Sequence, residues 1–435
     1  MILAKIHHFD IRPEGWLHWF TGPGNFDLPR GPLGVMVYLV FVPVFWIVPR
    51  PWRSAYLITT SLLLTLITVG HAFTLTVAAA ALASYLIICA GIHPRRYWIA
   101  VSILLASYAV LLMWPQPPWL PTVAEPIRFY LQWAGLAYLF LRSLHLLNDT
   151  ANRRMPLPNL REFLTYMLFA PTLRMGPIQR YADFKEQLHG NLAANRRFGT
   201  AFQRIATGIV RLMILAWLME NMPLESFFKD PWQYTTSQFL LRAYLAPMYF
   251  YLWMSGYADL SIGIARLMGF VLPENFNYPW LAVNITEFWR RWHITLSEWL
   301  RDYIFTPLVR RRWHYFWAFM ITFTFCGLWH GERSWVLMGI AQGVGLSIMR
   351  YWSQMWKRQK SRQTRLYRGL ARVGLVGTAF NSFLAWLLTY HYETATILVA
   401  MDVSHSGRWV GSRLIEMVTS YCQILCMGCL GGVLF

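Results

Sequence analysis

The sequence predicts an all-α, polytopic integral membrane protein with roughly 10–12 membrane helices, some of them short or re-entrant, because one span needs about 20 apolar residues. Three observations support this fold class. The chain is 56% hydrophobic and only 14% charged, whereas soluble domains carry about 25% charged residues. Long runs contain no Asp, Glu, Lys or Arg. Basic residues gather between these runs, as the positive-inside bias of membrane proteins requires.

The apolar runs follow one another along the chain. The run from Ser54 to Pro94 is long enough for two spans, and the shorter run from Ser334 to Met349 fits a tilted or re-entrant segment. The other charge-free runs are Gly31 to Pro49, Tyr97 to Ala124, His314 to Gly331, Val373 to Tyr392 and Met417 to Phe435. Residues 1–30 are polar, aromatic and rich in Pro and Gly. They predict an interfacial segment, and they lack the pattern of a cleaved signal peptide.

The net charge of +19 would suggest nucleic acid as a partner in a soluble protein. In a chain this apolar, the basic clusters instead predict cytoplasmic loops beside anionic membrane lipid. Arg350 to Arg372 contains eight Lys or Arg and no acid, and a smaller cluster spans Arg310 to Arg312. Orientation in the membrane is sufficient to explain these clusters, so we expect no nucleic-acid partner.

The whole chain, residues 1–435, is expected to form one membrane domain. The runs in the first third carry few polar residues, whereas polar residues appear inside apolar context from Tyr130 onward. A functional site is therefore expected in the later two thirds. Cys422, Cys426 and Cys429 have a spacing that resembles a metal motif, but their uncharged run contains no His or carboxylate. We expect small buried residues there and no metal site.

The segment Ile285 to Ile304 predicts one amphipathic helix that Pro307 ends. Residues that recur at helical spacing on one face are Trp289, His293, Leu296 and Leu300. The charges also follow helical spacing. Glu287 precedes Arg291 by four residues, which favours an ion pair, while the like charges of Glu298 and Asp302 require a cation such as Arg301. A helix with so many charges is expected near the membrane interface or in the wall of a polar cavity.

Two histidines are candidates for chemistry. His330 ends an apolar run, and a histidine is suited to general base work on a hydroxyl because its pKa is near neutrality. The glycines at 327 and 331 leave space beside its imidazole. His293 stands among Trp and Arg residues, where Asp302 and Glu298 are candidates to orient it. A packing role remains open for both histidines. No nucleophile elbow, phosphate-binding loop, dinucleotide fingerprint or HExxH motif is present, which favours direct transfer with a histidine base.

Two further segments place charge inside apolar context. In MSGYADLSIG, Asp259 is expected to pair with an internal cation such as Arg266. In PTLRMGPIQRY, Gly176 and Pro177 lie between two arginines, Arg174 and Arg180. This pattern fits a bent or re-entrant segment whose arginines either hold a phosphate group or pack internally.

These segments resemble a known family. ITEFWRRWHITLSEWLRDYIFTPL is similar to the signature of the membrane-bound O-acyltransferase family, and GLWHG resembles that family's histidine segment. SGYADLSIGIARLMGFVLPENFNYP and FAPTLRMGPIQRY resemble stretches of its bacterial alginate O-acetyltransferase branch. The resemblance covers residues 138–352, the expected catalytic core. One departure is VRRRW, from Val309 to Trp313, where relatives in the alginate branch carry a glycine-rich turn; D-alanyl transferases of the family stay open as the alternative.

The resemblance implies a membrane acyltransferase of a bacterial inner (plasma) membrane, with its helices around a polar tunnel. The family's catalytic histidine corresponds to His330 and its second histidine to His293. The candidates for substrate binding or for lining the tunnel are Trp289, Arg290, Asp302, Asp259, Gly327, Gly331 and Trp329. No tightly bound cofactor is implied.

The implied acyl donor is acetyl-CoA or an acyl-phosphopantetheine carrier, with an acyl carrier protein as a candidate partner. The implied acceptor is a hydroxyl of an extracytoplasmic polysaccharide or of a relay acyltransferase protein. Two rivals come from other classes. A transporter or channel would use the intramembrane His, Asp and Arg as a relay, although the halves of the chain show no internal symmetry. A non-catalytic assembly subunit would leave His330 replaceable.

Overall fold

The structure is a computed structural model that describes residues 31–68, 71–113, 136–173, 176–222, 227, 230–330, 333–362 and 374–401. Every regular element in these ranges is a helix, which confirms the all-α prediction for the part of the chain that the structure describes. The predicted interfacial segment 1–30, the last charge-free run and the three C-terminal cysteines lie outside the described residues.

The charge-free runs coincide with helices. The run from Ser54 to Pro94 forms two helices, as predicted, named α3 (Arg53–Thr68) and α4 (His71–Gly91). The other described runs form α2 (Gly31–Ile47), α5 (Pro94–Met113), α18 (Tyr315–Trp329) and α21 (Gly374–Met401). The short run from Ser334 to Met349 is the first part of a longer helix, α19 (Arg333–Ser361).

The chain divides into two compact units by its internal packing. Unit 1 comprises Met1–Ile209 and Tyr257–Pro273, and unit 2 comprises Val210–Gly256 and Glu274–Phe435. Two long helices, α12 (Phe198–Asn221) and α14 (Thr236–Leu267), contribute residues to both units. The single membrane domain 1–435 and the catalytic core 138–352 stay predictions.

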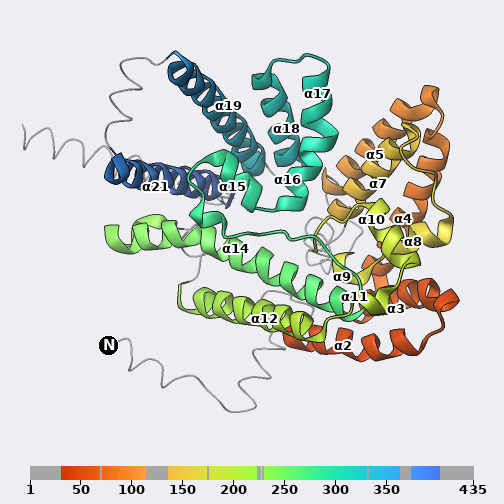
Figure 1. Ribbon diagram of the computed structural model, residues 1–435. Coiled ribbons are helices and arrows are strands. Elements are labelled where there is room, and N and C mark those ends of the chain that lie inside the picture. Colours follow the sequence, from red (N-terminus) through yellow and green to blue (C-terminus); the bar gives the residue numbers. More distant parts are fainter. Residues whose placement is uncertain are drawn as a thin grey trace, which may run out of the picture. The chain divides into compact units, whose positions relative to one another are not determined.

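Unit 1 is built on helices α3, α4, α5 and α7 (Leu136–Ala151), which pack in sequence against one another (Figure 1). Besides α2, its other elements include η2 (Arg50–Trp52), α8 (Leu160–Met167), α9 (Ala170–Leu173), α10 (Tyr181–His189) and α11 (Leu192–Asn195). Rings of Phe169, Phe184 and Phe270 form its aromatic core. Arg142 is fully buried and donates to the carbonyls of Tyr166 and Thr172 at 3.2 and 3.0 Å. A buried guanidinium thus satisfies carbonyl groups around the end of α8.

In unit 2, helices α18 and α19 lie side by side and pack extensively against each other (Figure 1). Its other elements are η3 (Pro231–Gln233), η4 (Pro279–Leu281), α15 (Ile285–Arg291), α16 (Ile294–Leu300), the π-helix η5 (Arg301–Phe305) and α17 (Thr306–Arg310). Glycines permit the close approach. A Cβ added at Gly327 would lie 2.7 Å from the Cα of Val336, and one added at Gly343 would lie 3.2 Å from the Cα of Met320.

The prediction of one amphipathic helix from 285 to 304 is wrong. The helix is interrupted at Trp292 and His293, where His293 adopts the left-handed conformation with φ 40° and ψ 54°. The preceding loop takes up the backbone groups that the break releases. The amide of Asn277 donates to the carbonyl of Arg291, and the amide of Ile294 donates to the carbonyl of Asn275, both at 2.9 Å. His293 therefore does not continue the helical face of Trp289.

Pro307 does not end the helical segment, which is a second correction. It occupies the first turn of α17, which follows the π-helix η5 (Arg301–Phe305) directly, so the helical path continues through the proline. The predicted ion pairs are confirmed. Arg291 Nη2 lies 2.6 Å from Glu287 Oε1, and Arg301 pairs with both Asp302 and Glu298, at 2.9 and 3.9 Å.

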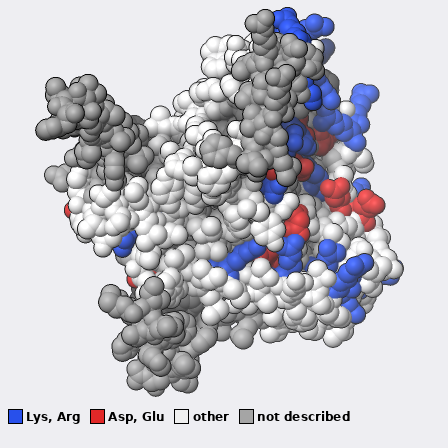
Figure 2. Space-filling model, turned by 60° about the vertical axis from the view of Figure 1, so that its left-hand side comes forward, with Lys and Arg blue, Asp and Glu red and all other residues white. Residues whose placement is uncertain are grey.

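Membrane-compatible surface is present in both units. Within the described residues, Phe73–Gly91 and Phe198–Asn221 are long and apolar enough to cross a membrane. Large apolar side chains on these helices are exposed, among them Leu75, Leu86 and Trp217. Figure 2 shows a face on which most of the described side chains are uncharged and Lys and Arg gather in part of the view. The expected number of 10–12 spans stays a prediction.

Candidate functional site

Unit 2 brings the two candidate histidines together. His330 follows the last residue of α18, and His293 joins α15 to α16. Contacts among the rings of Trp335, Phe250 and Trp292 link the two positions. This link supports a shared site.

His330 is held by the end of its helix and by an aromatic stack. Its backbone N–H donates to the carbonyls of Gly327 and Leu328, which fixes the last turn of α18. Its ring stacks on Trp335 of α19, with centroids 4.1 Å apart and planes 24° apart, and it meets Trp329 edge to face at 4.8 Å. His330 is half-buried, whereas Trp335 is buried. The imidazole therefore has one face covered and retains access to solvent or to a substrate.

His293 is buried, with 3% of its surface exposed. Asn275 organises the backbone around it. The Asn275 side-chain oxygen accepts from the Thr295 hydroxyl at 2.7 Å and from the Thr295 amide at 3.3 Å. These bonds hold the first turn of α16 and with it the left-handed backbone of His293. A non-glycine residue in that conformation costs about 1–3 kcal/mol, so the surrounding contacts must stabilise it.

Aromatic rings connect the two histidines. Trp335, which stacks on His330, lies 5.5 Å from Phe250 of α14. Phe250 stacks on Trp292, also at 5.5 Å, and Trp292 directly precedes His293. The three rings therefore form a continuous chain of contacts from the stacking partner of His330 to the neighbour of His293.

A chain of buried hydrogen bonds fixes the position of α15, the helix that precedes His293. Trp289 Nε1 donates to Gln342 Oε1, and Gln342 Nε2 donates to Glu393 Oε2, both at 2.8 Å. The chain joins α15, α19 and α21. Trp289 also meets Phe323 of α18 edge to face at 4.8 Å. Trp289 is therefore a packed anchor of the site segment, which gives this predicted tunnel-lining residue a definite position.

The remaining predicted residues have different positions. Trp329 is buried beside His330, while Arg290 is exposed. Asp302 is 42% exposed in its pair with Arg301. Gly331 lies outside the described residues. The space beside Gly327 is filled by the backbone of α19, so this glycine serves helix packing.

Asp259 belongs to unit 1, whereas both histidines belong to unit 2. Its carboxylate is buried and pairs with Arg204 Nη1 of α12 at 2.7 Å. The suggested partner Arg266 is thus replaced by a residue from another helix. The sequence could not distinguish these partners, because the choice depends on how α12 packs against α14.

Sequence reasoning missed several residues of this region. Trp335, Asn275 and Gln342 have no motif of their own, and only their contacts identify them. Glu393 did carry a signal, since an acid inside an apolar helix is a functional candidate. It directly follows a charge-free run and lies beyond the segment that resembled the family. Among the described residues, no three His, Cys, Asp or Glu side chains gather closely enough to hold a metal ion.

The geometry can support proton transfer. One imidazole is half-buried and the other is buried, and three aromatic rings link their positions. A neutral imidazole can accept a proton from a hydroxyl, and a second imidazole can position a substrate or adjust the first.

Comparison with known proteins adds independent information. Residues 52–380 match the model of the membrane-bound O-acyltransferase family, so the match begins well before the motifs that suggested it. A probable alginate O-acetylase of Pseudomonas aeruginosa is 33% identical over 224 residues, which is 50% of this chain and 42% of that protein. The chain spans about half the length of the alginate relatives it matches, for example 51% of the one from Pseudomonas fluorescens.

Relatives with other names also match. A teichoic acid D-alanyltransferase of Bacillus subtilis is 26% identical over 305 residues, covering 62% of this chain and 69% of the relative. A peptidoglycan O-acetyltransferase of Helicobacter pylori is 29% identical over 248 residues, covering 54% of this chain and 43% of the relative. The names share acyl transfer and differ in the acyl group and the acceptor.

Proposed function

The chain belongs to the membrane-bound O-acyltransferase family, and from this premise we propose that it transfers a small acyl group from a thioester donor to a hydroxyl of a cell-envelope polymer or of a relay protein. Acetyl is the leading candidate for the acyl group, because two of the relatives are named as O-acetyl-transferring enzymes, one for alginate and one for peptidoglycan. The observation that carries the proposal is the half-buried His330, stacked on Trp335 and linked through the rings of Phe250 and Trp292 to the position of His293.

The proposed reaction uses His330 as the general base. Its imidazole accepts the proton of the acceptor hydroxyl as the oxygen attacks the thioester carbonyl. The C–S bond breaks, the new ester keeps the acyl group, and the departing sulfur takes up a proton. His293 orients the donor or assists the transfer. In this proposal the rings of Trp335, Phe250 and Trp292 limit the access of water, which would otherwise hydrolyse the thioester.

The donor is proposed to be acetyl-CoA or an acyl-phosphopantetheine carrier that approaches from the cytoplasm, with the acceptor on the outer side of a bacterial inner membrane. Passing only the acyl group through the protein avoids moving a highly charged donor across the bilayer. Two candidate spans and the exposed apolar side chains of α4 and α12 support a membrane location. A D-alanyl group is the second candidate, supported by the teichoic acid relative.

The test is acyl transfer by the purified full chain in lipid nanodiscs. Labelled acetyl-CoA and a D-alanyl carrier are supplied separately, each with alginate, teichoic acid or peptidoglycan fragments as acceptor. His330→Gln should lower transfer about 10²–10⁴-fold, the usual contribution of a general base. The matched control is His71→Gln, an exposed histidine at the start of α4. Near-full turnover by the His330 variant would refute the mechanism.

A further inference from the structure

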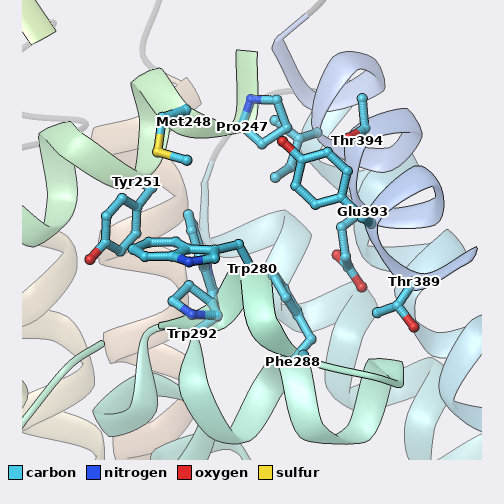
Figure 3. Close-up of a pocket in the computed structure, with 13 residues that line it drawn as sticks. Pro247, Met248, Tyr251, Trp280, Phe288, Trp292, Thr389, Glu393 and Thr394 are labelled. Carbon is cyan, nitrogen blue, oxygen red and sulfur yellow. The ribbon is translucent and has the colours of Figure 1, made fainter. Parts of the chain in front are cut away.

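Unit 2 contains a small pocket that the proposed reaction does not use. Three parts of the chain form its walls: α14, the segment from η4 to Trp292, and α21 (Figure 3). Its aromatic side chains are Tyr251, Trp280, Phe288, Trp292 and Tyr390. The cavity volume is about 30 Å³, and because one water needs roughly 10–15 Å³ by this measure, the space suits a small end group rather than a sugar ring.

Two buried polar residues of α21, Glu393 and Thr394, stand in the wall of this pocket. Each is only 4% exposed. Glu393 Oε2 accepts from Gln342, but neither Glu393 Oε1 nor Thr394 Oγ1 has a hydrogen-bond partner among the described residues. Buried polar atoms normally have partners, so these two atoms indicate a ligand or a bound solvent molecule.

The charge of the pocket is one-sided. Glu393 is its acid, and the described residues that line the pocket include no Lys, Arg or His. A buried carboxylate without a neighbouring cation is costly. The faces of Trp, Tyr and Phe rings attract cations as well. One of these rings already does so, since Arg211 Cζ, which does not line the pocket, lies 5.5 Å from the centroid of Tyr251.

We propose that this pocket binds a small organic ammonium group, held by the Glu393 carboxylate and the surrounding aromatic rings. Other occupants fit less well. An anionic group would meet the carboxylate without a compensating cation, and an alkyl chain would leave Glu393 Oε1 unpaired. The ammonium has two chemical sources: an aminoacyl group, such as the D-alanyl group that one relative is named for, or the ethanolamine head group of a membrane lipid.

The pocket is structurally connected to the histidine site. Trp292, which lines the pocket, directly precedes His293. Glu393 is also joined through Gln342 to Trp289. Binding of an ammonium group does not require acyl transfer, so this inference goes beyond the proposed function and can be tested without it.

The experiment measures binding by saturation-transfer NMR, with the purified full chain in phosphatidylglycerol nanodiscs that contain no ammonium lipid. The probes are D-alanine methyl ester, ethanolamine phosphate and methyl propionate, which has the skeleton of the first probe without its ammonium. We expect at least one ammonium probe to bind and the neutral probe not to bind. The tighter of the two ammonium probes identifies the source.

Glu393→Gln should weaken ammonium binding about tenfold or more, the effect of losing one charged hydrogen bond. Gln retains the acceptor for Gln342 and nearly the same volume. Glu220→Gln, an exposed acid of the same unit, is the control and should bind normally, as should His330→Ala. If Glu393→Gln fails to fold, Trp280→Leu tests the opposite wall and should also weaken binding.

Three results would overturn the inference. The first is that neither ammonium probe binds. The second is that methyl propionate binds as tightly as the D-alanine ester. The third is unchanged binding in a folded Glu393→Gln or Trp280→Leu variant, which would leave Glu393 as a structural, protonated side chain. Loss of acyl transfer with intact ammonium binding would instead count against the proposed function alone.

Discussion

At the scale of single residues, the structure changes how a substitution of His293 should be chosen. The residue is buried, and its left-handed backbone is one that histidine and asparagine adopt more readily than alanine. An alanine variant therefore combines loss of the imidazole with added backbone strain. The chemical and structural roles of this position can be separated only by comparing two variants.

We expect His293→Asn to lower acyl transfer strongly while the protein keeps most of its thermal stability, because Asn tolerates the left-handed conformation. His293→Ala should lower both transfer and the unfolding temperature. Transfer rate and unfolding temperature in detergent are the measurements. If His293→Asn transfers at the normal rate, His293 serves packing alone.

Glu162 is a residue whose ionisation should control local stability. Burial raises the pKa of its carboxyl, but hydrogen bonds from Tyr181 and His189 and the charge of Lys185 outweigh burial and hold the pKa below the ordinary 4.5. A carboxyl whose pKa is lower in the folded state stabilises the fold above the unfolded pKa, and this contribution is lost as pH falls through the folded pKa.

Unfolding of unit 1 should therefore become easier as the pH is lowered below about 4.5, the ordinary pKa, and Glu162→Gln should flatten this part of the profile. The measurement is unfolding temperature against pH, followed by protease cleavage within α8 to α10. Glu186→Gln, an exposed acid on α10, is the comparison. Equal acid sensitivity in the Glu162 variant and the wild type would contradict the assignment.

At the scale of elements, the contact between α18 and α19 depends on glycine. The backbone of α19 at Trp335 and Val336 occupies the place of a side chain at Gly327. This contact also sets the stack of Trp335 on His330, because both rings stand at the ends of these helices. A change in the packing of α18 against α19 should therefore also change the position of the His330 imidazole.

Gly327→Ala should destabilise the protein by about 1–3 kcal/mol, the usual cost of overpacking. It should also lower the rate of acyl transfer, because the same contact positions Trp335 against His330. Gly199→Ala, in α12, is the matched change, because a Cβ there meets nothing within 4 Å; it should be neutral or slightly stabilising. Unfolding in denaturant measures both. A Gly327 variant as stable as the Gly199 variant would show that the helices can separate at no cost.

The helices of the scaffold could be predicted from the sequence, and the break in the site segment could not. Charge-free runs mark helices because burial or lipid requires apolar side chains over a full span. The turn at His293 depends on hydrogen bonds to Asn275 and Asn277, from a different stretch of chain. The spacing of apolar residues predicts a single helix, but it contains no information about hydrogen bonds to a distant segment.

In the candidate site, too, some residues could be predicted from the sequence and others could be found only from contacts between distant segments. His330 and His293 could be identified from their residue type, context and resemblance to a family. Trp335 and Gln342 could be identified only from the contacts of α19, whereas Glu393 did carry a signal as an acid in an apolar context. The partner of Asp259 was predicted wrongly for the same reason, since Arg204 comes from a different helix.

At the scale of the whole molecule, the basic end of α19 should fix its orientation in the membrane. Arg358 and Lys360 stand in its last turn, and Ser361 beside them is exposed. Positive charge is retained on the cytoplasmic side, so this end of the helix is expected there.

A cysteine at Ser361, in a background without other cysteines, should resist an impermeant thiol reagent in intact cells and react after permeabilisation. Protection in both conditions would indicate burial in a complex rather than a cytoplasmic position. Efficient labelling in intact cells would reverse the topology, and with it the proposed entry side of the donor.

The hydrogen-bond chain from Trp289 through Gln342 to Glu393 and Thr396 also determines how this part of the protein opens. It joins three helices that are far apart in the sequence, and every one of these groups is buried. Opening α19 leaves polar groups of both other helices unsatisfied, and opening α15 or α21 leaves Gln342 without one of its partners. The three helices should therefore fluctuate as one cooperative unit. Amide protons in their buried turns would then exchange with deuterium at a common rate, set by a single opening event.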